Sequence, residues 1–244
     1  MATDFASIAR VLANPNRAAM VDRLMDGVPV TAGELARAAG VSPSTASDHL
    51  AQLQRAGLVT ATKAGRRRYF RLGGPGVAEA LEAFAQLCPP RDVRSLRQAR
   101  DAHDVAYLRT CYDHLAGAVA VALAERLQSL GWLRFDDAPV VTSLGAARFA
   151  SIGVDVEAAR AARRAFARQC LDWTERRPHL AGALGAAVAE AFFDNGWIRR
   201  RPSGRGVTLT ADGVSELHAR FGLRVEAPAG PSSGRRPSRS GARA

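Results

Sequence analysis

Two short, well-capped helices joined through a glycine constrain the fold of this chain more than any other feature. The first begins at Thr31, which has Glu34 three residues further on in the spacing of a capping box, and it ends at Gly40. The second begins at Ser42, a favourable N-cap, with Pro43 at the first helical position. This order predicts a helix-turn-helix, with an ordinary helical hairpin as the alternative.

The second helix combines an apolar underside with a small polar outer face. Ala46, Leu50 and Leu53 recur at helical spacing and are predicted to face a core, and Gly57 is placed to end the helix. The opposite face would fit a DNA major groove without steric conflict, because its side chains are short. These outward side chains are Ser44, Thr45, Ser47, Asp48 and Gln52.

After Val59 the hydrophobic period changes from helical to alternating. Residues 59–63 and 67–72 are predicted as two strands joined by a turn at Ala64-Gly65. Basic side chains crowd this hairpin: Lys63, Arg66, Arg67, Arg68 and Arg71. Such a basic tip indicates a wing that grips DNA phosphates. The alternative is a solvated edge strand protected by its charge.

Residues 8–72 resemble the winged helix-turn-helix of the ArsR family of bacterial transcriptional regulators. The similar segments are LANPNR at 12–17, SDHL at 47–50 with the helix exit at 53–59, and GRRRY at 65–69. The resemblance implies a homodimer that binds operator DNA and usually represses transcription, with the first helix and the helix near 77–87 paired across the two-fold. The residues expected to contact DNA are Ser42, Ser44, Thr45, Ser47, Asp48, His49, Gln52, Lys63, Arg66, Arg67, Arg68 and Tyr69.

Charge and composition narrow the class of protein. Lys and Arg number 34 against 23 Asp and Glu, and the net charge of +11 indicates a polyanionic partner. Three cysteines are too few for a disulfide framework and fit a reducing cytoplasm. We expect no membrane association, because no signal peptide and no apolar run of roughly 20 residues occurs. We expect no enzyme, because serine-hydrolase, phosphate-loop and zinc-protease motifs are all missing.

The second half contains an internal repeat. His-Leu-Ala-Gly at 114–117 recurs at 179–182, and Gly-Trp at 131–132 recurs at 196–197, both at an offset of 65 (179 − 114; 196 − 131). Each copy is predicted to start a helix at its His-Leu-Ala-Gly and to continue through a hairpin to a second helix. The expected fold class is therefore mainly α with small β-hairpins.

The predicted organisation has four parts. They are a winged helix-turn-helix DNA-binding and dimerisation domain (1–90), a connecting helix (91–105), a helical domain of two repeated helix–hairpin–helix units (106–226; repeats about 106–158 and 165–224), and a disordered basic tail (227–244).

Cysteine and histidine residues of the two copies suggest a ligand site. Cys111 and His114 are three residues apart, on one face if this stretch is helical, and Cys170 and His179 mirror them at nine residues apart. Thiolate and imidazole suit zinc, nickel, copper or trivalent arsenic. The unequal spacing speaks against a shared site, and both residue types also occur as ordinary core.

Two further roles for the second half stay open. One is a pocket for a small apolar ligand, lined by Tyr112, Trp132, Trp173 and Trp197. The other is a purely structural or dimer-building role. The metal positions usual in the resembled family are absent, because the first helix of the motif lacks cysteine and residues 77–87 lack a histidine pair. Any effector, whether metal, metalloid or small molecule, is therefore expected to act through the second half.

Three functions follow from the sequence. The first is a sequence-specific, homodimeric repressor of operator DNA. The second is a repressor that responds to a metal or metalloid through the C-terminal Cys and His residues. The third is a non-specific architectural DNA-binding protein. None of them requires a cofactor for the fold.

Overall fold

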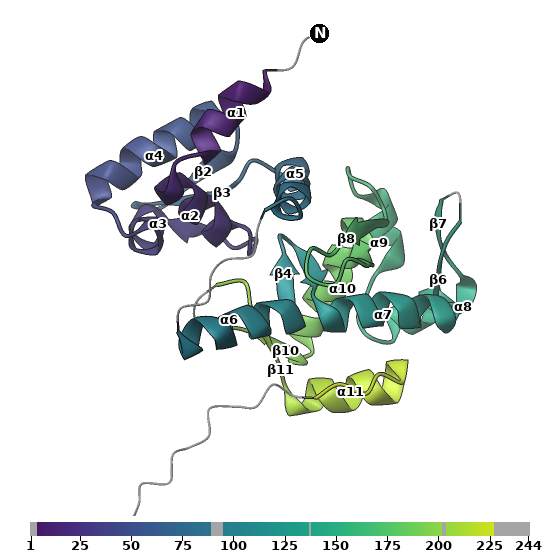
Figure 1. Ribbon diagram of the computed structural model, residues 1–244. Helices are drawn as coiled ribbons and strands as arrows, with labels where there is room; N and C mark the ends of the chain where they lie inside the picture. Colours follow the sequence, from purple (N-terminus) through teal and green to yellow (C-terminus); the bar gives the residue numbers. More distant parts are fainter. Residues whose placement is uncertain (1–3, 89–94, 137, 202–203, 227–244) are drawn as a thin grey trace, which may run out of the picture.

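The computed structural model describes residues 4–88, 95–136, 138–201 and 204–226 (Figure 1). Its first half contains α1 (Phe5–Leu12), α2 (Pro15–Leu24), β1 (Val30–Thr31), α3 (Ala32–Ala39), α4 (Pro43–Arg55), β2 (Val59–Ala64), β3 (Arg67–Leu72) and α5 (Pro75–Ala85). The second half contains α6 (Leu96–Tyr107), β4 (Arg109–Cys111), β5 (His114–Ala116), α7 (Ala118–Ser129), β6 (Leu133–Phe135), β7 (Pro139–Val141), α8 (Ser143–Ala150), α9 (Val156–Ala161), β8 (Arg168–Leu171), β9 (Pro178–Ala181), α10 (Gly182–Asp194), β10 (Ile198–Arg200), β11 (Val207–Leu209) and α11 (Ala211–Phe221). The predicted basic tail and residues 91–94 of the predicted connecting helix lie outside the described residues.

The first half is a winged helix-turn-helix, as predicted. Thr31 and Glu34 form the capping box of α3, with Glu34 N–H donating to Thr31 Oγ1 at 3.3 Å and Thr31 N–H donating to Glu34 Oε2 at 2.8 Å. Gly40 ends α3 at φ +67°, a left-handed conformation that favours glycine. Ser42 then caps α4 by accepting from Thr45 N–H. Because both caps act within four residues, the sequence alone defines both ends of this turn.

The hairpin of the wing differs from the prediction by one residue. Ala64 still pairs with Arg67, so the turn lies at Gly65-Arg66 rather than at Ala64-Gly65. Gly65 takes φ +60°, which an alanine would adopt at a cost. Strand β1 pairs with β3 on the other side and was not expected, because two residues are too short to show an alternating pattern.

The core of the winged helix lies beneath α4. Ala46, Leu50 and Leu53 are fully buried there, as predicted, and they share one cluster with Leu35 of α3 and Phe70 of β3. Helix α4 therefore buries its apolar stripe and keeps its other face toward solvent.

The second half corrects the predicted helices at His-Leu-Ala-Gly. His114 lies on strand β5 and His179 on strand β9, and helices α7 and α10 begin only after these strands end. The breaks fall at Gly117 (φ +93°) and Gly182 (φ +83°), where a Cβ would come within 3 Å of the backbone of Ala106 and Ala165. Short apolar runs do not distinguish strand from helix, so the sequence pattern was ambiguous here.

The elements of the second half follow the order hairpin, helix, hairpin, helix twice, with α9 between the two series. Helix α7 packs on β9 and helix α10 packs on β5, so each helix covers a strand of the other series. Gly185 permits this approach, because a Cβ there would lie 3.4 Å from Cβ of His114 and 2.7 Å from the carbonyl of Leu180. No helix in the described part of the chain is both long and apolar enough to cross a membrane.

The two halves meet where α2 ends against strand β4 and its turn (Figure 1). The N–H of Tyr112 donates to the carbonyl of Met25 at 2.8 Å, and Thr110 Oγ1 donates to the carbonyl of Asp26 at 3.3 Å. Gly27 takes φ +75°, and a Cβ on it would lie 1.9 Å from the carbonyl oxygen of Tyr112. Only glycine fits this junction.

The junction predicts a specific cost for Gly27→Ala. Gly57→Ala is a matched control, because Gly57 has φ +72° but no atom within 4 Å of its would-be Cβ. The control should lose roughly 1–2 kcal/mol of unfolding free energy through backbone strain alone. Gly27→Ala should lose about 3 kcal/mol or more, because the clash with Tyr112 adds to that strain. Urea unfolding measures both, and equal losses would contradict the described junction.

Candidate functional site

Helix α4 presents the small polar side chains expected to contact DNA. Ser44, Thr45, Ser47 and Asp48 are all exposed, as is the cap Ser42. Oγ of Ser42 lies 2.9 Å from both Ser44 Oγ and Thr45 Oγ1, and Ser47 Oγ donates to the carbonyl of Pro43 at 3.0 Å. These hydroxyls therefore form an ordered polar face at the beginning of the helix.

Two of the expected contact residues on α4 are half-buried. Oε1 of Gln52 accepts from Nη1 of Arg17 at 2.9 Å, so this side chain connects α4 to α2. Neither ring nitrogen of His49 has a hydrogen-bond partner among the described residues. The structure thus gives Gln52 a positioning contact within the protein, and leaves the ring of His49 with unused polar atoms.

The wing carries its basic side chains at the tip. Lys63, Arg66, Arg67 and Arg68 are exposed, whereas Tyr69 is half-buried. Nη2 of Arg68 donates to Oε1 of Gln54 on α4 at 3.2 Å, which couples the position of the wing to that of the helix. Cations gathered beside an exposed helix suit binding to a phosphate backbone.

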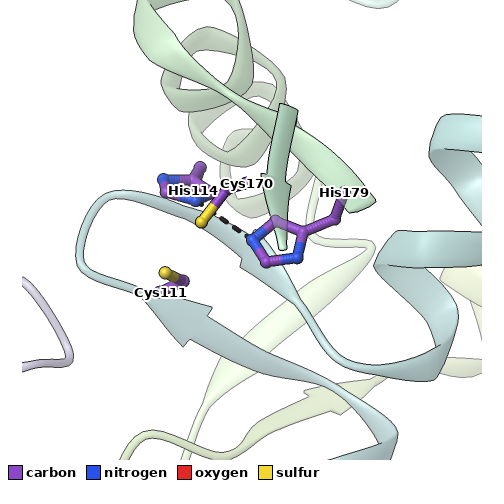
Figure 2. Close-up of side chains that lie close together, drawn as sticks. All are labelled: Cys111, His114, Cys170 and His179. Atoms are coloured by element: carbon purple, nitrogen blue, oxygen red, sulfur yellow. Dashed lines mark hydrogen bonds between the residues drawn. The ribbon is translucent and has the colours of Figure 1, made fainter. Parts of the chain in front are cut away.

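The structure brings together four residues of the second half that the sequence named as candidate metal ligands. One ligand atom each from Cys111, His114, Cys170 and His179 lies within 4.8 Å of all the others (Figure 2). Three of the four side chains are buried, and Cys170 is half-buried. They come from strands β4, β5, β8 and β9, and strand β5 contacts β9.

Sheet register explains the unequal spacing of the two pairs. Cys111 and His114 are cross-strand partners in the β4–β5 hairpin, and Cys170 and His179 are cross-strand partners in β8–β9. The first hairpin turns through two residues and the second through a longer loop, so three and nine residues of separation give the same pairing. The expectation of one helical face was wrong, and the spacing carries no argument against a shared site.

A carboxylate lies beside Nδ1 of each imidazole. Nδ1 of His114 lies 3.2 Å from Oδ1 of Asp113, and because a carboxylate only accepts, this nitrogen donates. Nδ1 of His179 lies 3.2 Å from Oδ2 of Asp172, at ion-pair distance but without hydrogen-bond geometry. The two Nε2 atoms face each other at 3.2 Å, joined by the dashed line in Figure 2.

The two thiols of the cluster differ in acidity. The Cys111 thiol, its neighbour in the cluster, lowers the pKa of Cys170 by hydrogen bonding, and His114 and His179 lower it further. The same contact with Cys170, together with burial, raises the pKa of Cys111. Burial works against the charged form of His179, but the nearby Asp172 carboxylate and Cys170 sulfur raise its pKa. These contacts therefore favour the charged forms of Cys170 and His179 against the effect of burial.

Asp172 is the centre of a buried polar network. Oδ2 accepts from Arg109 Nη2 at 3.0 Å and from the N–H of Gly117 at 2.7 Å, and Oδ1 accepts from Thr174 Oγ1 at 2.6 Å. Burial opposes ionisation, but His179, Arg109 and Thr174 keep the pKa of Asp172 well below its usual range. Sequence reasoning missed Arg109 entirely, since one more arginine carries no signal in a basic chain.

A small cavity opens beside the cluster. It has a volume of about 50 Å³ and is lined by Cys111, His114 and Cys170 together with Arg164 and residues of α5. One water needs roughly 10–15 Å³ of such space, so the cavity has room for a few water molecules beside the cluster. Nη1 of Arg164 pairs with Asp113 at its edge.

The four aromatic residues proposed to line a ligand pocket do not surround one cavity. Trp132 packs on Phe149 and Phe221 at ring distances of 5.4 and 5.2 Å, and Trp197 packs on Phe192 at 5.0 Å. The other two lie elsewhere: Tyr112 lines the small cavity, and Trp173 lies under the guanidinium of Arg109 at 4.8 Å. Their size made them pocket candidates, whereas the core of the second half uses Trp132 and Trp197 as packing residues.

Comparison with known proteins gives the family. A family model described as a helix-turn-helix domain matches residues 12–61. The uncharacterized HTH-type transcriptional regulator YdfF of Bacillus subtilis (strain 168) is 42% identical over 226 residues, which cover 92% of this chain and 100% of that protein. The HTH-type transcriptional regulator CmtR of Mycobacterium tuberculosis (strain ATCC 25618 / H37Rv) is 38% identical over 82 residues, covering 34% of this chain and 69% of CmtR.

A solved structure also matches part of the chain. It is the NMR structure of the cadmium metal-sensor CMTR from Mycobacterium tuberculosis, with 35% identity, a TM-score of 0.31, and coverage of 37% of this chain and 94% of that chain. Because the likeness to YdfF spans nearly the whole chain, the protein belongs to the family of HTH-type transcriptional regulators. The predicted DNA-binding, winged helix-turn-helix regulator is confirmed at this level.

The network around Asp172 predicts a large stability difference between two Asp→Asn variants. Asp172→Asn leaves the guanidinium of Arg109 buried without its counter-charge, since both side chains are 0% exposed. It should lose about 3–5 kcal/mol of unfolding free energy. Asp136→Asn is the control, because the Arg134–Asp136 pair is mostly exposed, and it should lose less than about 1 kcal/mol. Urea unfolding in chelator compares them, and a near-neutral Asp172→Asn would refute the network.

Proposed function

We propose that this protein is a cytoplasmic, homodimeric repressor of the ArsR type that binds a palindromic operator. The observation that carries the proposal is helix α4, capped at Ser42, held by a fully buried apolar underside and exposed along a face of short polar side chains. In this proposal α4 enters the major groove, and the exposed cations of the wing contact the flanking phosphates.

Exposed apolar side chains on α1 and α5 support dimerisation. Phe5 and Ile8 on α1, and Phe84 and Leu87 on or just after α5, are large and exposed, with Leu87 at 81% and Phe5 at 80%. Large apolar side chains that are exposed in this way mark an interaction surface where they adjoin one another. A two-fold dimer through these helices would present two copies of α4 about one turn of DNA apart, which matches a palindrome.

We further infer that the domain boundaries are those predicted from the sequence. The DNA-binding and dimerisation domain would end near residue 90, and the C-terminal domain would begin near residue 106. Two copies of one unit would make up that domain. The repeated order of hairpin, helix, hairpin and helix supports the duplication, and so does the equivalent pairing of Cys111 with His114 and of Cys170 with His179.

A metal-responsive repressor is a second candidate function. The specific observation in its favour is the convergence of two thiols and two imidazoles in the C-terminal half. No comparable group of aromatic side chains supports the small apolar effector among the described residues. The operator-binding role of α4 is the same in both candidates.

Adding a negative charge to the α4 face should abolish sequence-specific binding. Thr45→Glu places a carboxylate on an exposed position that faces DNA phosphates and base edges in this proposal, so affinity for duplexes selected by the wild-type protein from a random library should fall about 100-fold. Ser215→Glu is the control, since it adds the same charge on exposed α11, at the other end of the molecule (Figure 1).

Fluorescence anisotropy gives the affinities, and light scattering checks that both variants remain dimers. Normal operator binding by Thr45→Glu would refute the docking of α4. Footprinting adds the decisive comparison with an architectural protein: a regulator protects one discrete palindrome, whereas uniform protection of any duplex would overturn the proposal.

Removing the wing cations should weaken all duplexes alike. Arg66, Arg67 and Arg68 are exposed, and each phosphate contact contributes about 0.9 to the slope of log K against log salt. The triple alanine variant should lower that slope by about 3 and leave the preferred sequence unchanged. The matched control, Arg134, Arg148 and Arg163 to alanine, removes the same charge elsewhere and should leave most of the slope. A changed base preference with an unchanged slope would contradict the wing assignment.

A further inference from the structure

The geometry of the Cys/His cluster points to one bound ion. We propose that Cys111, His114, Cys170 and His179 bind a single divalent cation of the zinc group, Zn²⁺ or Cd²⁺, in a tetrahedral site. We propose also that this ion fixes the position of the β4–β5 hairpin, which contacts the end of α2. The coordination stands on the cluster alone, whereas its regulatory consequence rests on the proposed function.

The distances fit a tetrahedron before any ion is placed. Zinc–nitrogen bonds of 2.0–2.1 Å give a nitrogen–nitrogen edge of about 3.3 Å in a regular tetrahedron. The two Nε2 atoms of His114 and His179 are 3.2 Å apart, and all four ligand atoms lie within 4.8 Å of one another. An ion can therefore enter without moving the strands apart.

The hydrogen-bond pattern also suits coordination. Asp113 and Asp172 lie at the Nδ1 atoms of the two histidines, which directs both Nε2 lone pairs toward the cluster. A hydrogen bond between two Nε2 atoms needs a proton on one of them, and a cation would replace that proton. Binding releases this proton, together with any proton still carried by the two thiols, to solvent, without any transfer of electrons.

The donor set selects the ion. Two sulfurs and two nitrogens in a tetrahedral arrangement suit Zn²⁺ or Cd²⁺, whereas Ni²⁺ prefers square-planar or tetragonal sites and Mg²⁺ or Ca²⁺ prefers oxygen. Thiolates at Cys111 and Cys170 would carry two negative charges, which a divalent cation balances. All four positions of the tetrahedron are taken by protein atoms, so the site leaves no open position for catalysis.

The ion would act on the winged helix through the neighbours of Cys111. Thr110 and Tyr112 flank this ligand, and both hydrogen-bond to the end of α2, at Asp26 and Met25. Tyr112 has φ +62°, a strained conformation for a tyrosine, so the turn between the first pair of ligands stores strain. At the other end of α2, Arg17 holds Gln52 on α4. Loading the site is thus linked to α4 by an unbroken series of contacts.

The coordination is tested on the full chain with metal ions alone. Purified protein stripped with chelator is titrated with Co²⁺, read by its tetrahedral visible bands, and then with Zn²⁺ or Cd²⁺, read by elemental analysis after desalting. We expect one ion per chain, with Zn²⁺ displacing Co²⁺. Cys111→Ser and His179→Gln should each lower the affinity at least about 100-fold, because losing a mere outer-shell partner of a ligand already costs about 10–100-fold. Cys88→Ser and His218→Gln are matched controls, because both residues are exposed and lie outside the cluster.

A readout without mutation covers the case of a misfolded variant. Zn²⁺ should protect Cys170 and Cys111 of the wild-type protein from alkylation and leave Cys88 fully reactive, as located by mass spectrometry. Absence of retained metal, octahedral Co²⁺ spectra, or equal alkylation of all thiols with and without Zn²⁺ would overturn the site.

The regulatory consequence is tested with the selected duplex and the same proteins. Zn²⁺ should change operator affinity at least about 5-fold, and the duplex should change Zn²⁺ affinity by the same factor, since coupling is reciprocal. Cys111→Ser should remove both effects. Tight metal binding with unchanged operator affinity would overturn the coupling and leave the coordination standing. Failure to bind any duplex selectively, with metal stoichiometry intact, would overturn the proposed function instead.

Discussion

The buried carboxylate of Asp172 is the interaction on which the second half depends. It receives the guanidinium of Arg109 from β4 and the N–H of Gly117 at the start of α7, while it closes its own turn through Thr174. A buried charge is tolerated only when paired and hydrogen-bonded, so these three partners must assemble together. Once they do, the β8–β9 hairpin lies beside β4–β5, and His179 faces His114. The Cys/His cluster is therefore a consequence of a polar network that sits next to it.

The winged helix could be predicted from the sequence because its signals are local. Thr31 and Ser42 cap their helices through atoms three residues away, and Gly40 supplies the left-handed residue between them. The wing hairpin was predicted as well, except for its turn, which lies one residue later because Ala64 still pairs with Arg67. That error concerns register, which depends on pairing between strands and not on any single residue.

The second half was less predictable because its organisation depends on long-range pairing. His114 and His179 read as helix starts, yet both lie on short buried strands whose partners decide their conformation. The same pairing made the sequence argument about spacing fail, since separations of three and of nine residues both end in a Cys–His cross-strand pair. Residue chemistry alone named the four candidate ligands, but their convergence depends on strand pairing that the spacing argument did not anticipate. Arg109, which supports Asp172, had no distinguishing signal.

Each hairpin supplies one sulfur and one nitrogen to the cluster, so neither hairpin alone could hold an ion in four-fold coordination. Binding of an ion here would therefore require the two hairpins to be packed against each other. One of them, β4–β5, also contacts the end of α2 through Tyr112. An ion can shift the winged helix only by its difference in affinity for two arrangements of this junction. At Gly27 the backbone lies directly against the backbone of Tyr112, with no room for a side chain between them. A small displacement of this turn therefore cannot be taken up by a flexible side chain and must move the backbone at the end of α2.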